Sequence, residues 1–107
     1  MRGSLVTIVS SGDFGKPRPA LILQADAFAT LDSVTVLPLT SAVTHAPLFR
    51  ISLQPDARNG LKAVSQIMVD KAVTIRRDKL GPAFGSVGAE TLVAVERALL
   101  VFLGIAR

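Results

Sequence analysis

The sequence contains no cysteine, tryptophan or tyrosine, and its one histidine is His45. Without cysteine the chain forms no disulfide and has no thiolate nucleophile or thiolate metal ligand. Its histidine and carboxylates do not cluster at metal-ligand spacing, so we predict no metal site and no cofactor. The lack of tryptophan and tyrosine leaves few side chains on which nucleic-acid bases could stack.

Long hydrophobic runs are also missing. The apolar stretch at residues 99–106 is far shorter than the roughly 20 residues that a membrane-spanning helix needs. The N-terminal run Leu5–Val9 is interrupted by Thr7 and lacks the small-residue cleavage pattern of a signal peptide. We therefore expect a cytoplasmic protein that does not associate with membranes.

Apolar residues and positive charge are abundant. The 107 residues suit one domain, 1–107, and half of them are apolar. So small a core cannot hide them all easily, which favours a homodimer, although a well-filled monomer remains the alternative. The net charge of +4 suits a polyanionic partner, but the same balance occurs in proteins that it merely keeps soluble.

Short β-branched and alternating segments, separated by glycine and proline turns, dominate the chain. Residues 89–103 instead show helical spacing, with Glu90 in the first turn and Gly104 as the C-terminal stop. Together they predict a mostly-β (α+β) fold, an SH3-like curved β-barrel of five to seven strands with a C-terminal α-helix. The predicted strands are 5–9, 20–24, 33–39, 48–53, 63–70 (continued by 72–75 past a bulge) and 84–87, with a helical turn at 77–80 ended by Gly81-Pro82.

Two segments could carry chemistry. Arg18 stands between Pro17 and Pro19, which stiffen the entrance of a strand and present the guanidinium from a rigid platform; Lys16 adds a second cation. An arginine held beside a phosphate stabilises charge that builds up there. By itself this could equally be an exposed arginine at the start of a strand.

The second segment ends a hydrophobic strand in two hydroxyls, Thr40 and Ser41, after Pro38. Hydroxyls at a strand end can bind a phosphate or a sugar, but they can equally stabilise a turn. Pro38 predicts an edge position or a bulge, because proline cannot donate a ladder hydrogen bond.

Taken together, these segments resemble the MazF/PemK family of type II toxin–antitoxin toxins. The similarity runs nearly end to end, and its strongest elements are Arg-Pro-Ala-Leu at 18–21 and Pro-Leu-Thr-Ser at 38–41. The resemblance implies a homodimer that cleaves single-stranded RNA and arrests translation, and a cognate antitoxin that covers the RNA groove with an extended acidic segment. It also implies that Arg18 and Thr40 are the catalytic pair.

Such cleavage can proceed without a metal, because RNA supplies its own nucleophile, the 2′-hydroxyl. Arginine keeps its proton at ordinary pH, so we assign Arg18 to charge stabilisation and expect Thr40 to hold a phosphate oxygen or the leaving group. The proton acceptor is less evident: His45 and Asp13 are the candidates, and both could instead be ordinary loop residues.

Further cations and hydroxyls are candidates for contacts with RNA or with the antitoxin. Where many relatives have Gln-Ile-Arg-Thr after the acidic residue, this chain has Lys-Ala-Val-Thr at 71–74. The loss of that arginine bears on RNA sequence preference more than on chemistry. The candidates are Lys16, Ser41, Lys71, Arg76 and Arg77, the last three in a basic cluster that could instead be a solvated face.

Two other functions fit the predicted fold. A gyrase poison of the CcdB type shares the fold and the dimer, but its helix ends in Trp-Gly-Ile, whereas this chain has Gly-Ile at 104–105 without the tryptophan. A binding module without catalytic activity is the second alternative.

Overall fold

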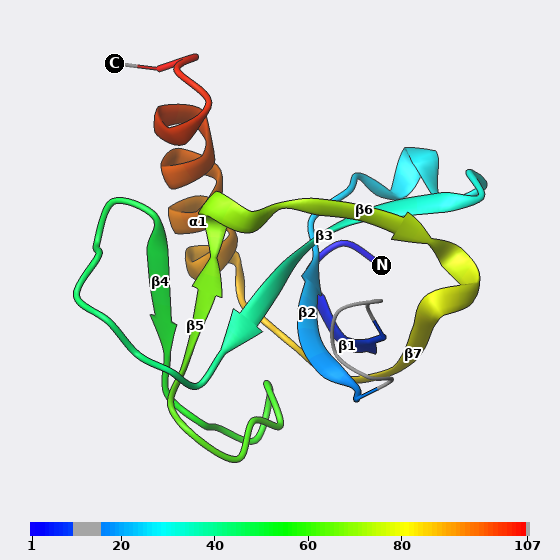
Figure 1. Cartoon of the computed structure of the whole chain (residues 1–107), viewed down its shortest axis with the longest axis horizontal. Coiled ribbons are helices and arrows are strands. Elements are labelled where there is room, and N and C mark those ends of the chain that lie inside the picture. Colours follow the sequence, from blue (N-terminus) through cyan, green and yellow to red (C-terminus); the bar gives the residue numbers. More distant parts are fainter. Residues whose placement is uncertain (10–15, 107) are drawn as a thin grey trace.

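A computed structural model describes residues 1–9 and 16–106 of the chain. Figure 1 shows a strongly bent sheet with a single long helix standing against one side of it. Within the described residues the strands are β1 (Ser4–Ile8), β2 (Arg18–Ile22), β3 (Ser33–Thr40), β4 (Arg50–Leu53), β5 (Ser65–Met68), β6 (Val73–Arg76) and β7 (Leu80–Ser86), and the helix is α1 (Ala89–Phe102). Short 3₁₀ turns occupy Asp26–Phe28, Val69–Lys71 and Arg77–Lys79.

The central strand is β3, which is the longest and has two different partners along one of its edges. The sheet order is β4-β5-β3-β2-β1-β7, and β6 pairs with β3 beside β5. All these pairings are antiparallel. The predicted mostly-β fold with a C-terminal helix is confirmed, although the sheet is not closed, because no pairing among the described strands joins β7 to β4 or β6.

Strand alternation gives the sheet two faces that carry different side chains. We call the face packed against α1 the helix face; it includes Leu21, Leu37 and Ile67, which join Val95 of the helix in one buried cluster. The opposite side, the inner face, holds a second buried cluster that includes Ala20, Val34 and Val36. The bend of the sheet encloses this second cluster, and the inner face continues beyond it toward the ends of β2, β3 and β5.

Pro38 lies in the centre of the sheet, so the predicted edge position or bulge is wrong. Pro38 pairs with Ala20 of β2 on one side. On the other side, β6 pairs with residues 33–36 of β3 and β5 with residues 39–40. Pro38 therefore falls between two partners, where no ladder hydrogen bond is required of its missing N–H.

The predicted helical turn at 77–80 exists as the 3₁₀ turn Arg77–Lys79. Gly81-Pro82, however, does not form the break that was expected after this turn. These residues lie inside β7, where the pairing with β1 shifts between Leu80 and Ala83. A Cβ on Gly81 would clash with the Thr7 hydroxyl oxygen, so any other residue there would force the Thr7 side chain to shift, and glycine fits the close approach of β1. Residues that look like strand breakers instead form an irregularity within a strand.

The other differences are small, except for one that shapes the site. The predicted strand 63–70 is interrupted by the 3₁₀ turn Val69–Lys71 in place of a bulge, and β6 then returns along the same edge of β3. The predicted strand at 48–53 begins at Arg50. Helix α1 ends as predicted, with Gly104 at a φ of +75°.

Candidate functional site

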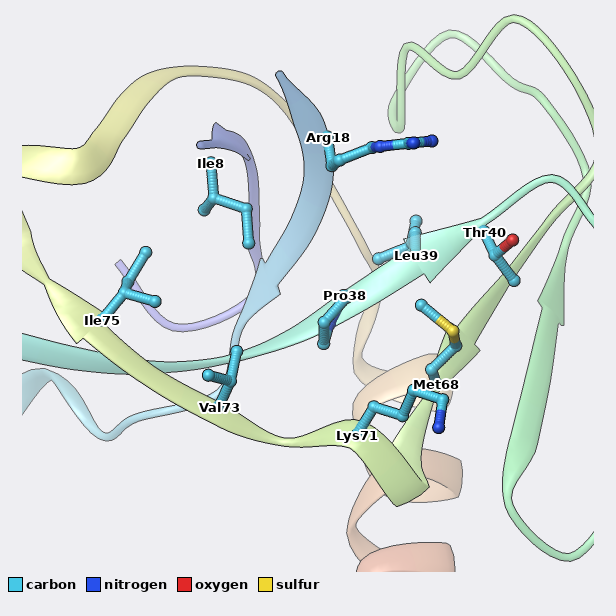
Figure 2. Close-up of a pocket in the computed structure, with 9 residues that line it drawn as sticks. All are labelled: Ile8, Arg18, Pro38, Leu39, Thr40, Met68, Lys71, Val73 and Ile75. Carbon is cyan, nitrogen blue, oxygen red and sulfur yellow. The ribbon is translucent and has the colours of Figure 1, made fainter. Parts of the chain in front are cut away.

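A pocket of about 360 Å³ opens on the inner face, where β2 begins and β3 ends. Figure 2 shows its lining side chains converging from β1, β2, β3, β5, β6 and the turn Val69–Lys71. The polar ones, Arg18, Thr40 and Lys71, come from three separate elements. The apolar wall consists of Ile8, Pro38, Leu39, Met68, Val73 and Ile75.

The β2–β3 register explains why Arg18 and Thr40 meet. Ala20 pairs with Pro38, so continuing the register by two residues places Arg18 opposite Thr40. Residues opposite one another in an antiparallel pair project from the same face. Both side chains line the pocket, as the resemblance required, and Figure 2 shows the Arg18 side chain extending toward the end of β3.

Each of these two side chains is held differently. Arg18 is the first residue of β2 and pairs with Ile8 of β1, and the adjacent Pro17 and Pro19 fix their own φ angles. The Thr40 Oγ1 accepts a hydrogen bond of 3.1 Å from the Ala42 backbone N–H. Because the oxygen accepts there, the hydroxyl hydrogen remains able to donate to a ligand.

Lys71 reaches the pocket because of the turn Val69–Lys71. Its Nζ lies 3.6 Å from Asp70 Oδ2, and the side chain is 57% exposed. The turn carries the chain from β5 to β6, which leaves a gap beside β3 near Pro38, and Lys71 stands at this gap. A cation therefore occupies the rim of the pocket, opposite the side from which Arg18 enters (Figure 2).

The basic cluster expected from the sequence is divided by the fold. Val73 and Ile75 of β6 face the pocket, so by alternation Arg76 projects from the other side of the sheet. Arg76 pairs with Asp78 at 2.7 Å, and both line a different hollow at the far end of β3. Arg77 donates from Nε to the Leu31 carbonyl at 2.8 Å, a contact that ties the end of β6 to the loop before β3.

The remaining predicted residues lie outside the pocket lining. Lys16 is exposed and precedes β2. Ser41 and His45 are exposed in the loop after β3. Asp13 lies outside the described residues. In the part of the chain that the structure describes, no three histidine or carboxylate side chains gather closely enough to hold a metal ion.

The sequence reasoning missed the apolar wall, Gln66 and Arg50. Gln66 is buried beside Thr40, where its amide accepts from the Thr44 N–H and donates to the Thr44 carbonyl. It thus ties down the loop that contains Ser41 and His45. Gln66 could have been noticed as a polar residue within an otherwise apolar strand. Arg50 could have been noticed from the alternation at 48–53, which places it on the polar side of that strand.

Comparison with known proteins agrees with this architecture. Residues 2–103 match the family described as PemK-like, MazF-like toxin of type II toxin–antitoxin system, and the chain belongs to this family. It is 46% identical over 106 residues to a protein of Mycolicibacterium smegmatis named probable endoribonuclease MazF, covering 98% of this chain and 97% of that one.

Solved structures show the same fold. The Mycobacterium tuberculosis toxin MazF-mt6 superposes with a TM-score of 0.84 at 26% identity, over 97% of this chain and 99% of that chain. A MazE–MazF crystal structure from Deinococcus radiodurans matches with a TM-score of 0.78 at 25% identity, over 98% and 95% of the two chains. No helix within the described residues is long and apolar enough to cross a membrane.

Proposed function

We propose that this protein is an endoribonuclease toxin that cleaves single-stranded RNA at the pocket containing Arg18 and Thr40. The observation that carries the proposal is that β2 and β3 bring these two side chains into one pocket of the inner face. The name of the 46% identical relative, probable endoribonuclease MazF, supports the same activity. Family membership favours this function over a gyrase poison of the same fold or a binding module.

The proposed reaction needs only groups that RNA and the protein supply. The 2′-hydroxyl oxygen bonds to phosphorus as the bond from phosphorus to the 5′-oxygen breaks, giving a cyclic phosphate and a 5′-hydroxyl. The 2′-hydroxyl gives up a proton, and the departing oxygen takes one up. Arg18 stabilises the negative charge that grows on the phosphate, and the Thr40 hydroxyl donates to a phosphate oxygen or the departing oxygen.

The proton acceptor stays a prediction. His45 carries an imidazole, a common proton acceptor, and lies on the loop that begins at Ser41, which the contacts between Thr44 and Gln66 hold beside Thr40. Asp13 is the other candidate.

The same pocket is the proposed antitoxin site. It joins an apolar wall to a rim of cations, a surface that suits an extended acidic segment with apolar side chains between its charges. The Deinococcus radiodurans structure is a MazE–MazF complex, which supports an antitoxin partner for this chain. Such a segment would exclude RNA by occupying the place of the scissile phosphate.

We further propose a homodimer that buries the exposed side of α1. Val95 is the only fully buried residue of this described helix, whereas Val93, Leu100 and Val101 are exposed, as is Phe102 at its end. So many exposed apolar side chains on one helix are typical of an interface. Sedimentation equilibrium should give a dimer mass, and Val101→Glu should shift it toward the monomer; a monomeric parent chain would contradict this.

Mapping of cleavage products tests the activity. The purified protein is incubated with mixed single-stranded RNA in EDTA, and both product ends are identified. We expect a cyclic phosphate on one fragment and a 5′-hydroxyl on the other, and a single 2′-deoxy substitution at the cut site should prevent cleavage. Cleavage of the deoxy substrate, or dependence on an added metal, would overturn the proposed reaction.

A further inference from the structure

The inner face continues past the pocket across β5 to β4. Thr40 pairs with Gln66 of β5, and Gln66 pairs with Ser52 of β4. Met68, which lines the pocket, pairs with Arg50. Because paired residues share a face, Arg50 projects from the same side of the sheet as Arg18 and Thr40, two residues along β4 from Ser52, which ends their row.

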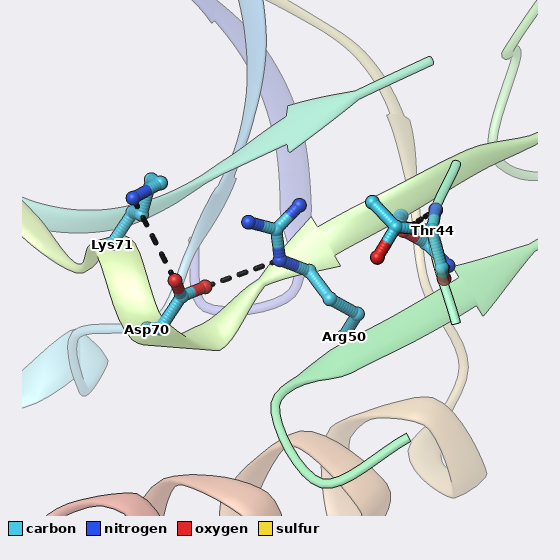
Figure 3. A network of polar contacts seen from close by, with 5 residues as sticks. Thr44, Arg50, Asp70 and Lys71 are labelled. Atoms are coloured by element: carbon cyan, nitrogen blue, oxygen red, sulfur yellow. Dashed lines mark hydrogen bonds and ion pairs between the residues drawn. The ribbon is translucent and has the colours of Figure 1, made fainter. Parts of the chain in front are cut away.

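Arg50 is held in place by a carboxylate. Its Nε lies 3.2 Å from Asp70 Oδ1, and the side chains of Arg50 and Asp70 are only 13% and 18% exposed. Figure 3 shows the Arg50 side chain running from β4 over β5 to meet Asp70, whose other oxygen faces Lys71. The Arg50 guanidinium also lies over the Phe49 ring, 5.8 Å from its centroid.

This arrangement leaves positive charge and donors available. Arg50, Asp70 and Lys71 carry a net charge of +1, so the carboxylate does not neutralise the two cations beside it. The hydrogen bond from Arg50 to Asp70 uses Nε. In the described part of the chain, neither Nη nitrogen of Arg50 makes a hydrogen bond. The Arg50 guanidinium is thus oriented by the Asp70 carboxylate and keeps its Nη–H donors for a ligand, an arrangement that is suited to bind a phosphate.

The distance across the sheet separates this position from the scissile phosphate. Two strands, β3 and β5, lie between Arg18 on β2 and Arg50 on β4. At a strand spacing of about 4.8 Å, β2 and β4 lie roughly 14 Å apart across the sheet, and Arg50 is in addition displaced by two residues along the strands. We infer that Arg50, oriented by Asp70, binds the phosphate of a nucleotide flanking the cut site and so extends the RNA groove across β5 to β4. This inference rests on the proposed ribonuclease function.

The test compares the RNA affinity of variants in which Asp70 is never left as a carboxylate without its arginine partner. Asp70→Asn is the reference, and Arg50→Gln with Asp70→Asn removes the guanidinium without leaving an unpaired carboxylate. Arg76→Gln is the matched control, since Arg76 projects from the side of the sheet away from the pocket and pairs with Asp78. The probe is an RNA oligonucleotide carrying the mapped cut site, with a 2′-deoxy residue there to prevent cleavage.

We expect the double variant to bind about tenfold more weakly than Asp70→Asn, as befits the loss of one charge-assisted contact. The slope of log Kd against log salt should fall by about 0.7, the value for one phosphate contact to a single strand. Arg76→Gln should bind as the parent protein does. Shortening the oligonucleotide at the end that reaches β4 should lower the affinity of Asp70→Asn for RNA until it equals that of the double variant.

Thermal unfolding of each variant keeps a folding defect from being taken for a binding defect. If the parent protein binds and cleaves RNA, but the double variant and Asp70→Asn have the same affinity and salt slope, the role of Arg50 is overturned and the proposed function stands. An equal loss in the double variant with long and short oligonucleotides would also overturn it. A parent protein that neither binds nor cleaves RNA would overturn the proposed function as well.

Discussion

The two faces of the sheet use the same strands for different purposes. On the helix face, Leu37 and Ile67 are fully buried against α1. On the inner face, their neighbours in sequence, Pro38 and Met68, line an open pocket together with Arg18 and Thr40. Alternation thus lets each strand contribute to stability on one side and to the proposed chemistry on the other, so substitutions of adjacent residues should have separable effects.

The largest effect on activity should come from Arg18→Ala. Removing a preorganised charge from the site of a developing oxyanion costs about 10²–10³-fold in rate, and here no second cation stands opposite Thr40 in the β2–β3 register of the described residues. Single-turnover cleavage of a defined RNA measures the loss. Because Arg18 is exposed at the start of β2, the variant should remain folded, which its thermal unfolding checks. Near-normal cleavage would remove Arg18 from the mechanism.

The largest effect on stability should come from the opposite face. Leu37→Ala removes a fully buried side chain beneath α1 and should lower the free energy of unfolding by about 2–5 kcal/mol. Chemical denaturation measures this change. At a temperature where the variant is folded, its single-turnover rate should match the parent's, and a collapse of the rate in folded protein would show that the faces are coupled.

A smaller effect is expected from Lys71→Gln at the rim of the pocket. Lys71 is more than half exposed and shares Asp70 with Arg50, so its removal should weaken RNA binding about threefold to tenfold. The KM for cleavage should rise more than kcat falls. A loss confined to kcat would instead give Lys71 a part in the chemical step.

The smallest effect should come from Arg76→Gln. Arg76 projects from the opposite side of the sheet to the pocket, and its partner is Asp78. We expect RNA cleavage within about twofold of the parent, because the substitution removes a charge without touching the groove. A loss as large as that of Lys71→Gln would show that RNA extends around the edge of β6.

Much of this organisation could be predicted from the sequence, because strand alternation and helix spacing are local patterns. The strand containing Leu37 and the helix ending at Gly104 are examples, and the Arg18 and Thr40 segments were recognised by their motifs. The division of the basic cluster could not be predicted, since it depends on which face of β6 Arg76 occupies. That face is fixed by the turn Val69–Lys71 and by pairing with β3.

Arg50 was missed for a similar reason. The alternation at 48–53 put Arg50 on the polar side of its strand, but its place beside the pocket depends on the long-range β4–β5 and β5–β3 registers, which a short segment of sequence does not reveal. Gly81-Pro82 predicted a break in the chain where the structure has a strand. Glycine is typical of turns, but it also occurs where two strands approach closely, as β1 and β7 do here.

The central claim is that Arg18 and Thr40 act on the same phosphate, and a double-mutant cycle tests it most directly. Single-turnover rates are measured for Arg18→Ala, Thr40→Val and the double variant, all confirmed to be folded. If the two groups act as a unit, the double variant should be scarcely slower than the slower single variant. Losses that multiply would mean that the two side chains act independently and would contradict the account.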